Sequence, residues 1–514
     1  MFFLITSHYG CEPGLEFNLR VGEAGGIVSH DIPAKKRQAE PAQLQGYGER
    51  EYMNHKERPV ADWTLMVYVG STAVLDSFAV ESLKQMKRAA GEGVIVAAQF
   101  DASGHDEIRR LIFDGTGDLG GSIEDNVVER FVPDNSEDPS VFLEDFIAWA
   151  YARPNCRAKR YCLVLWTDGS LSPAPATDED SQEVRDSRRR QNFLLPVELR
   201  ATLEKVRATG QKKFDIIAMD ACNMSMIEDV YELRDCAEFL IASEEEIPDS
   251  SCPYEQLLPL FRKPKDETTL EICRKIAIEY KRAYQDYISN ESTGLKKVTL
   301  SCLQLDHVNE IKEPLDELSQ ALLSAIEDAN TRKAIIAARQ GAKSFIAGLF
   351  ADAFGFCDQL LKELTARNIA NKGLESACVK LCHAISTPDV QARLVVENQT
   401  SEPHRCHGLS IYFPYSTEAE KVIFNQFHVA KGGTDLLNKG GDQGIAQIEA
   451  YYETLQLAKD THWDEFIGFG WSRCLIKEMP LELNVHYSAQ QCAIHLDRYL
   501  NMLEENSKGA SVAA

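Results

Sequence analysis

One cysteine in this 514-residue sequence has the surroundings expected of a nucleophile. Cys222 comes just after the apolar run 214–219 and just before 224–234, a segment with helical spacing. The N–H groups and the dipole at the start of a helix favour a thiolate, which is the reactive form of cysteine. A small buried cysteine that closes a strand would have the same surroundings. Position alone therefore predicts either a nucleophile or a core residue.

The segments around Cys222 alternate between expected strands and expected helices. Short continuous apolar runs, typical of strands buried on both faces, occur at 64–69, 94–100, 161–166, 214–219 and 239–242. Helical spacing occurs around 78–86 and at 141–151, 195–206 and 224–234, and 108–113 has the pattern of the returning arm of a hairpin. This alternation predicts an α/β fold, with a mostly parallel sheet between layers of helices. Sites in such sheets gather at the carboxyl ends of the strands, here after Trp166 and after Met219.

The remaining sequence predicts two further regions. We expect an N-terminal extension at 1–61, the α/β domain at 62–262, and a largely helical region at 263–514 that contributes extra strands. Helices are expected at 270–288, 308–329, 354–366 and 486–503, and strands at 298–303 and 409–413. Cys378, Cys382 and His383 lie close together in sequence, but helical spacing there predicts core positions rather than a metal site.

The composition argues against several classes of function. A formal net charge of −24 makes nucleic acid an improbable main partner, because surfaces that bind phosphate backbones are basic. No apolar run approaches the ~20 residues that span a bilayer, so we expect no membrane partner. Fourteen cysteines without CxxC pairs are typical of a reducing compartment and predict a cytoplasmic protein. Without GxGxxG or P-loop signatures, a small-molecule α/β enzyme is a weak alternative.

Several motifs between about residues 62 and 415 resemble, in the same order, those of the clostripain family of cysteine peptidases. They are Trp63–Val69, Leu163–Trp166, Asp220-Ala-Cys222, Tyr231-Glu-Leu-Arg234, Ile241-Ala-Ser-Glu-Glu245 and Gly408–Pro414. The resemblance implies a caspase-like fold, protein or peptide substrates, and Cys222 as the nucleophile.

The position of the family's catalytic histidine differs in this chain. The family's third strand typically ends in Trp-x-His-Gly, whereas this sequence reads Trp166-Thr-Asp168-Gly169. An imidazolium lowers the pKa of a thiol and later protonates the leaving amine, whereas a carboxylate raises that pKa and is ionised at pH 7. Asp168 is therefore compatible with a natural pseudoenzyme, an inactivated variant or an enzyme with another base. His105, His404 and His407 lie in no obvious substitute position.

The resemblance also implies the residues that recognise the substrate. Asp220 and Asp249 would line the pocket for the residue before the cleaved bond, where two carboxylates select Arg or Lys. Asp220 would equally suit a turn or a helix N-cap. The backbone N–H groups of Gly169 and Cys222 are the expected oxyanion donors. The residues themselves predict no cofactor and no metal site, and the sequence shows no twelve-residue calcium loop. The resemblance implies that calcium can bind, so calcium stays open.

The connection 170–193 is long for a compact domain and has no helical or strand period. Members of the family mature by cleavage after basic residues between the histidine and the cysteine. The resemblance therefore implies a processing site at Arg188, Arg189 and Arg190, cut by the protein itself or by an upstream protease. A solvated charged loop would have the same composition.

These features predict a clostripain-like cysteine endopeptidase that cleaves after Arg or Lys and is made as a precursor. The alternative is a catalytically dead caspase-like module that binds a peptide or a partner protein. Asp168 favours this alternative. The Asp220-Ala-Cys222 motif and the Arg-rich loop favour the enzyme.

Overall fold

The computed structural model describes most of the chain from residue 60 onward. The described residues are 60–70, 75–102, 107–133, 139–167, 194, 196–248, 250–262, 267–289, 298–345, 348–386, 394–402, 405–414 and 452–471. All of them belong to one compact unit, His55–Ala514. The predicted features that lie outside the described residues are most of the N-terminal extension, His105, Asp168, Gly169, loop 170–193, Asp249, His404 and the helix at 486–503.

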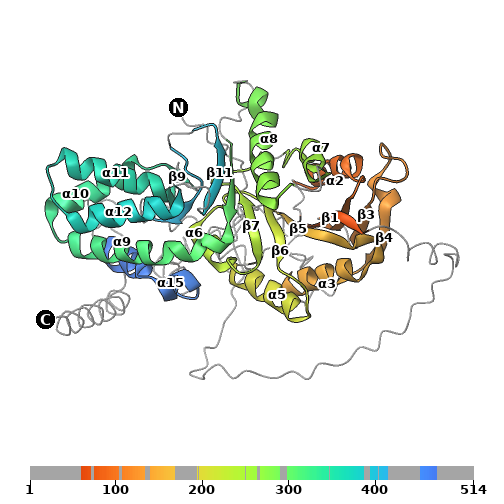
Figure 1. Ribbon diagram of the computed structural model, residues 1–514, viewed down its shortest axis with the longest axis horizontal. Helices are drawn as coiled ribbons and strands as arrows, with labels where there is room; N and C mark the ends of the chain where they lie inside the picture. Colours follow the sequence, from red (N-terminus) through yellow and green to blue (C-terminus); the bar gives the residue numbers. More distant parts are fainter. Residues whose placement is uncertain are drawn as a thin grey trace, which may run out of the picture. The chain divides into compact units, whose positions relative to one another are not determined.

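A nine-stranded sheet contains all five of the predicted buried strands (Figure 1). Its spatial order is β11 (Val395–Thr400), β8 (Thr299–Gln304), β7 (Ala237–Ala242), β6 (Phe214–Asp220), β5 (Ala158–Trp166), β1 (Ala61–Gly70), β2 (Val94–Asp101), β3 (Ile108–Phe113) and β4 (Val127–Phe131). Neighbours from β7 through β6, β5 and β1 to β2 are parallel, and the pairs toward both edges are antiparallel. The α/β prediction is confirmed, including the hairpin of β2 and β3.

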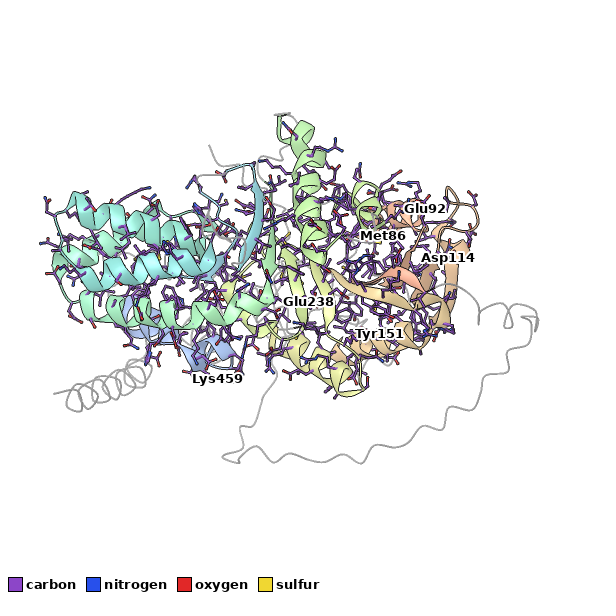
Figure 2. All side chains as sticks on the ribbon, viewed as in Figure 1. Met86, Glu92, Asp114, Tyr151, Glu238 and Lys459 are labelled. Carbon is purple, nitrogen blue, oxygen red and sulfur yellow. The ribbon has the colours of Figure 1, made fainter. Side chains whose placement is uncertain are left out.

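Helices cover both faces of the sheet because its central strands are apolar on both sides. Along β1, Trp63, Leu65 and Val67 enter one core, and Met66 and Tyr68 enter the other. The first core includes α2 (Asp76–Ala89), α7 (Tyr254–Leu257), η4 (Leu258–Arg262) and α8 (Thr269–Ser289), and the second includes α3 (Pro139–Ala152), η3 (Pro154–Cys156), α5 (Pro196–Ala208) and α6 (Ile227–Glu232). Figure 2 labels one side chain of each layer, Met86 on α2 and Tyr151 on α3.

The C-terminal region adds strands to the main sheet and forms a second, smaller one. The strands β8 and β11 extend the main sheet beyond β7, and β12 (Ser410–Tyr412), β10 (Phe350–Asp352) and β9 (Ser344–Phe345) form an antiparallel sheet. The other elements are η2 (Ile123–Asn126), η6 (Leu305–Ile311), α9 (Lys312–Ala325), α10 (Ala329–Gly341), α11 (Ala353–Ala366), α12 (Lys372–Ile385), α15 (Gln456–Asp460), α16 (Trp463–Glu465) and the π-helical turn η8 (Phe466–Trp471).

Two predictions about this region need correction. The helix predicted at 308–329 is interrupted, because the Asp328 carboxylate accepts a hydrogen bond of 2.8 Å from the Thr331 N–H and starts a new helix, α10. Cys378 and Cys382 are buried as predicted, but His383 is exposed on the outer face of α12. None of the described helices combines the length and the apolar character needed to cross a bilayer.

Candidate active site

The strands β5 and β6 end side by side, in register. Trp166 is paired with Asp220 in the parallel ladder, and the Thr167 N–H donates a hydrogen bond of 3.3 Å to the Asp220 carbonyl oxygen. Beyond this pair, the chain continues to Asp168 from β5 and to Cys222 from β6. Because Asp168 lies outside the described residues, its contact with Cys222 stays a prediction.

Cys222 lies in a tight turn after β6, where its side chain is partly buried. The Ile247 backbone N–H donates to Cys222 Sγ, with 3.3 Å between nitrogen and sulfur. The Cys222 thiol donates in turn to the Ile247 carbonyl oxygen, with 3.9 Å between sulfur and oxygen. Asn223 follows with a φ of 56°, a left-handed conformation that asparagine tolerates better than most residues. The turn is anchored where the Ser225 N–H donates to the Ser243 carbonyl oxygen at 2.9 Å.

The sequence predicted that Cys222 lies at the start of a helix. The structure shows that it does not. The segment expected to be helical at 224–234 contains only a short helix, α6, which begins at Ile227. The residues before it are extended, and Met226 forms a parallel bridge with Ser410 of the small sheet. This pairing competes with helix formation, so activation by a helix dipole is wrong. The Ile247 N–H is the donor that the described structure places beside the thiol.

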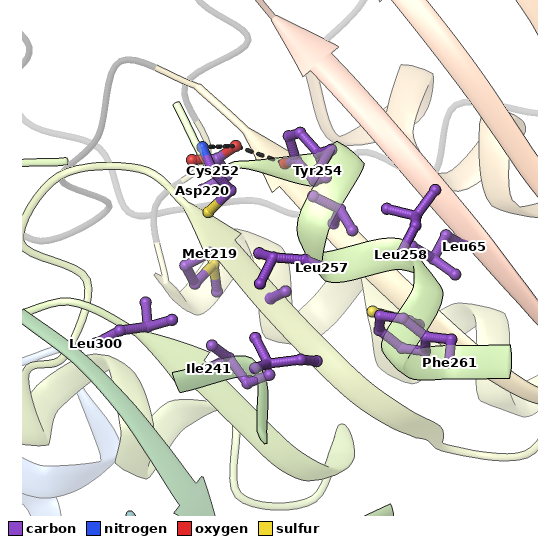
Figure 3. Close-up of a pocket in the computed structure, with 14 residues that line it drawn as sticks. Leu65, Met219, Asp220, Ile241, Cys252, Tyr254, Leu257, Leu258, Phe261 and Leu300 are labelled. Carbon is purple, nitrogen blue, oxygen red and sulfur yellow. Dashed lines mark hydrogen bonds between the residues drawn. The ribbon is translucent and has the colours of Figure 1, made fainter. Parts of the chain in front are cut away.

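Asp220 is a buried carboxylate, with only 4% of its surface exposed. Its Oδ2 accepts hydrogen bonds from the Tyr254 hydroxyl at 2.5 Å and from the Cys252 N–H at 3.4 Å (Figure 3). The Ser251 hydroxyl also donates to Oδ2. Burial raises the pKa of Asp220, and these hydrogen bonds oppose the rise. The side chain caps no described helix, so its role as an N-cap is wrong. Its partners instead come from the loop after β7.

A small cavity of about 40 Å³ lies on the α7 and α8 side of the sheet, and Asp220 forms part of its wall (Figure 3). Among the described residues that line this cavity, Asp220 is the one that carries a charge. The other lining residues include Cys162, Val164, Ile241 and Leu257. Such a volume suits a few water molecules rather than the side chain of a substrate. The cavity is therefore part of the core beneath the site.

Sequence reasoning missed the residues that surround Asp220. Ser251 belongs to the loop after β7 and Tyr254 is the first residue of α7, and no local signal marks either as a neighbour of Asp220. The sequence identified Trp166 only as the end of a strand. In the structure its indole Nε1–H also donates a hydrogen bond of 2.6 Å to Ser251 Oγ and so helps to hold Ser251 beside Asp220. Asp249, the second predicted pocket acid, lies in the same loop but outside the described residues.

A buried acidic cluster joins β7 to the C-terminal region. The Glu244 Oε2 accepts a hydrogen bond of 2.8 Å from the Gly408 N–H. Burial, together with the charge of Asp352 and a hydrogen bond with it, raises the pKa of Glu244 well above its usual value. His407 Nδ1 lies 2.8 Å from Asp352 Oδ1. Burial lowers the pKa of His407, but Asp352 outweighs this effect and raises it. His407 is therefore a partly buried histidine whose ring is held by Asp352 and stacks on Phe354.

Another cluster tests whether the described residues fit calcium. In the part of the chain that the structure describes, possible metal-ligand atoms come together at Glu245, Glu402 and Cys406. The Lys343 ammonium lies 2.5 Å from a Glu245 oxygen and 2.7 Å from a Glu402 oxygen. A cation is therefore already paired with both carboxylates, and a thiol is a poor ligand for a hard cation. This cluster does not fit a calcium site.

Comparisons with known proteins identify similar folds and a matching family. Among solved structures, the chain is similar to a secreted C11 cysteine protease from Bacteroides thetaiotaomicron, with 14% identity, a TM-score of 0.50, and coverage of 79% of this chain and 100% of that chain. It is also similar to an inactive zymogen C11 protease from Parabacteroides distasonis, with 17% identity, a TM-score of 0.49, and coverage of 79% and 99%. No curated protein sequence gives a match. The model of the clostripain family matches residues 67–475, which is more than half of the sequence, and the chain therefore belongs to the clostripain family of cysteine proteases.

Proposed function

We propose that this chain is a cysteine endopeptidase scaffold in which Cys222 is the nucleophile and Asp168 occupies the position of the base. The register of Trp166 with Asp220 carries this proposal. Asp168 and Cys222 each follow this pair by two residues, so both would lie at the same edge of the sheet. Catalytic groups often gather at the carboxyl ends of adjacent parallel strands.

The chemistry of the site explains why Asp168 matters. The Cys222 thiolate would attack the carbonyl carbon of the peptide bond, with the N–H groups of Cys222 and Gly169 as donors to the oxyanion. The leaving amine then needs a proton. An ionised carboxylate has no proton to give, and its charge disfavours the thiolate beside it. The protein with Asp168 is therefore expected to cleave slowly or not at all.

The pocket for the residue before the cleaved bond is proposed to select Arg or Lys. Support comes from Asp220, whose Oδ1 is buried and accepts no hydrogen bond from any residue in the described ranges. A buried carboxylate oxygen without a donor is an unfavourable arrangement that a cationic side chain would relieve. Asp249 is proposed as the second acid. Substrates would be proteins or peptides with basic residues.

We propose further that the protein is made as a precursor and matures by cleavage at Arg188, Arg189 or Arg190. Support comes from the place of loop 170–193 in the chain. The loop begins directly after the Trp166-Thr-Asp168-Gly169 motif and leads to α5, so a cut there releases a chain end next to the site. The cut would be made by the protein itself or by an upstream protease.

One observation favours a second function, that of a catalytically dead module that binds a peptide or a partner protein. The Trp166-Thr-Asp168-Gly169 motif retains the scaffold of the family's motif and lacks only the imidazole. A module of this kind would keep the pocket around Asp220 and bind basic peptides without cutting them.

The replacement of Asp168 by histidine separates these functions. Asp168→His should raise the rate of cleavage of a fluorogenic peptide with Arg before the cleaved bond by a factor of ~100 or more, the usual contribution of a positioned acid–base group. Asp168→Asn is the matched control, because it removes the charge without supplying a base, and it should give a much smaller gain. Cys222→Ala should abolish the activity.

If the unaltered protein already cleaves at full rate and Asp168→His slows the cleavage, another base operates. If every variant binds the peptide and none cleaves it, the binding module is correct.

A further inference from the structure

The segment after β7 holds the turn that carries Cys222. We call this segment, residues 243–247, the strap. The Asn223 N–H donates to the Glu245 carbonyl oxygen at 3.1 Å, and the Ile247 N–H donates to Cys222 Sγ at 3.3 Å. The position of the strap therefore determines where the Ile247 N–H lies relative to the sulfur.

A buried lysine from the C-terminal region pairs with the strap. Lys343 comes just before β9, and its side chain is only 5% exposed. Its ammonium lies 2.5 Å from a Glu245 oxygen and 2.7 Å from a Glu402 oxygen. The Lys343 carbonyl oxygen accepts a hydrogen bond of 2.9 Å from the N–H of Asp352, the last residue of β10. Lys343 thus connects the strap to the small sheet.

The two carboxylates that Lys343 contacts have different neighbours. Glu245 lies in the strap, two residues before Ile247. Glu402 follows β11, and its N–H donates to Thr400 Oγ1 at 2.9 Å. The two carboxylate side chains are similarly buried, with 17% and 21% of their surfaces exposed. The loss of either carboxylate removes half of the same ion-pair cluster, but the loss of Glu245 is the one that separates the strap from Lys343.

The Ile247 N–H affects the two forms of the Cys222 thiol differently. A thiolate accepts a charge-assisted hydrogen bond, which is stronger than one accepted by a neutral thiol. The thiol also donates to the Ile247 carbonyl oxygen, but this contact is longer, at 3.9 Å, and is lost when the proton leaves. Because the thiolate is the reactive form, an N–H held on the sulfur should increase the reactivity of Cys222 at neutral pH.

We propose that Lys343 is a positioning residue for the nucleophile, because its pairing with Glu245 holds the strap so that the Ile247 N–H stays on the Cys222 sulfur. This inference rests on the proposed function, since it treats Cys222 as the nucleophile. Lys343 acts through Glu245 and the strap and need not touch the substrate. The C-terminal region, which supplies Lys343, thereby controls the reactivity of the thiol.

Alkylation of Cys222 by iodoacetamide tests this inference without requiring catalysis. The protein is the full chain, and peptide mass spectrometry measures the rate at Cys222 separately from the other cysteines. Glu245→Met should slow the alkylation at pH 7 by about threefold to tenfold, as expected when one hydrogen bond to a charged group is weakened. The loss of negative charge alone would have the opposite effect, because it favours the thiolate. The direction of the change therefore separates positioning from charge.

Glu402→Met is the matched control, because it removes the other carboxylate that Lys343 contacts. The two variants should lose similar stability in urea denaturation, but Glu402→Met should leave the alkylation rate at Cys222 unchanged. The rates of Glu245→Met and of the unaltered protein should converge as pH rises toward about 10, where the thiol is ionised in both proteins.

Lys343 itself is tested with two substitutions. Lys343→Met should slow the alkylation in the same way as Glu245→Met, and Lys343→Arg, which keeps the charge, should retain a faster rate than Lys343→Met. Lys343→Met leaves two carboxylates without their cation and can fail to fold, which circular dichroism will show. In that case Glu245→Met and Glu402→Met decide the result.

Failure of the inference and failure of the proposed function give different results. If Asp168→His cleaves peptides, but Cys222 is alkylated as fast in Glu245→Met as in Glu402→Met, the inference is overturned and the proposed function stands. A difference that persists at about pH 10 also overturns the inference, because the strap would then control access to the sulfur rather than its ionisation. If the alkylation rates follow the prediction while Asp168→His cleaves nothing, the proposed function fails and Lys343 still positions the thiol.

Discussion

The hydroxyl of Ser225 donates a hydrogen bond of 2.6 Å to the carbonyl oxygen of Gly408. Ser225 lies in the turn that follows Cys222, whereas Gly408 leads into β12 of the small sheet. The Ser410 N–H returns a hydrogen bond of 2.9 Å to the Ser225 carbonyl oxygen, and Met226 bridges to Ser410. The turn after the nucleophile is therefore supported by the C-terminal region, which must be folded for the site to form.

Gly408→Ala should destabilise the protein more than an ordinary glycine substitution. Gly408 has a φ of 97°, and an added Cβ would lie 2.9 Å from Ser301 Oγ and 3.0 Å from Val395 Cγ1. Strained backbone and overpacking together should lower the free energy of unfolding by ~2–4 kcal/mol. Gly117→Ala is the matched control, because Gly117 has a φ of 83° but open space around the added Cβ. Urea denaturation measures the free energy of unfolding of both variants. An equal decrease in the two variants would show that Gly408 is not tightly packed.

Glu244→Gln should change the pH dependence of stability. Burial raises the folded-state pKa of Glu244 well above 4.5, and Asp352 contributes further to this rise. The protonated Glu244 therefore stabilises the folded protein fully below the unfolded-state pKa, and this stabilisation is lost as pH rises through the folded-state pKa. Glutamine keeps the shape of the neutral acid and does not ionise. The variant should therefore gain stability relative to the unaltered protein as pH rises. Urea denaturation across pH 6–9 measures this difference, with the exposed Glu246→Gln as control. A constant difference would mean that Glu244 is already ionised in the folded protein.

Trypsin should cut the folded protein first near Arg188, Arg189 and Arg190, because loop 170–193 carries clustered charge without an apolar period. The two fragments should remain associated. The strands β5 and β6, on opposite sides of the cut, are parallel neighbours and share buried residues such as Leu163 and Ile217. Size-exclusion chromatography of the digest tests this. Replacement of the three arginines with glutamine should slow the first cut, and fragments that separate on the column would contradict a single sheet.

The sequence predicted the part of the fold that depends on local pattern. The strands β1, β2, β5, β6 and β7 are continuous apolar runs because both of their faces are buried. Helices α3, α5, α8 and α11 lie within a few residues of their predicted bounds, because each has an apolar face with helical spacing. Cys222 and Asp220 could be named because their motif lies directly after one of these strands.

The remaining features depend on contacts between distant segments. Strand β11 contains Glu397, Asn398 and Gln399 and is a strand because it completes the sheet edge beside β8. Ser225 and Met226 lie in a segment with helical spacing, but Ser225 hydrogen-bonds to Ser243, just after β7, and Met226 bridges to Ser410 of β12. Likewise, the partners of the buried Asp220 are Ser251, from the loop after β7, and Tyr254, at the start of α7, and neither is marked by a local pattern. Such tertiary contacts override local propensity.

Covalent labelling of Cys222 tests the central claim most directly. A peptidyl chloromethyl ketone with Arg next to the reactive group should label the Asp168→His protein at a single site, and peptide mass spectrometry should assign the adduct to Cys222. Cys222→Ala should remove the label, and Asp220→Asn should reduce its rate of formation by about tenfold or more through loss of the charge-assisted contact. An adduct on another cysteine, or no adduct on Cys222 in a folded Asp168→His protein, would contradict the assignment of Cys222 as the nucleophile.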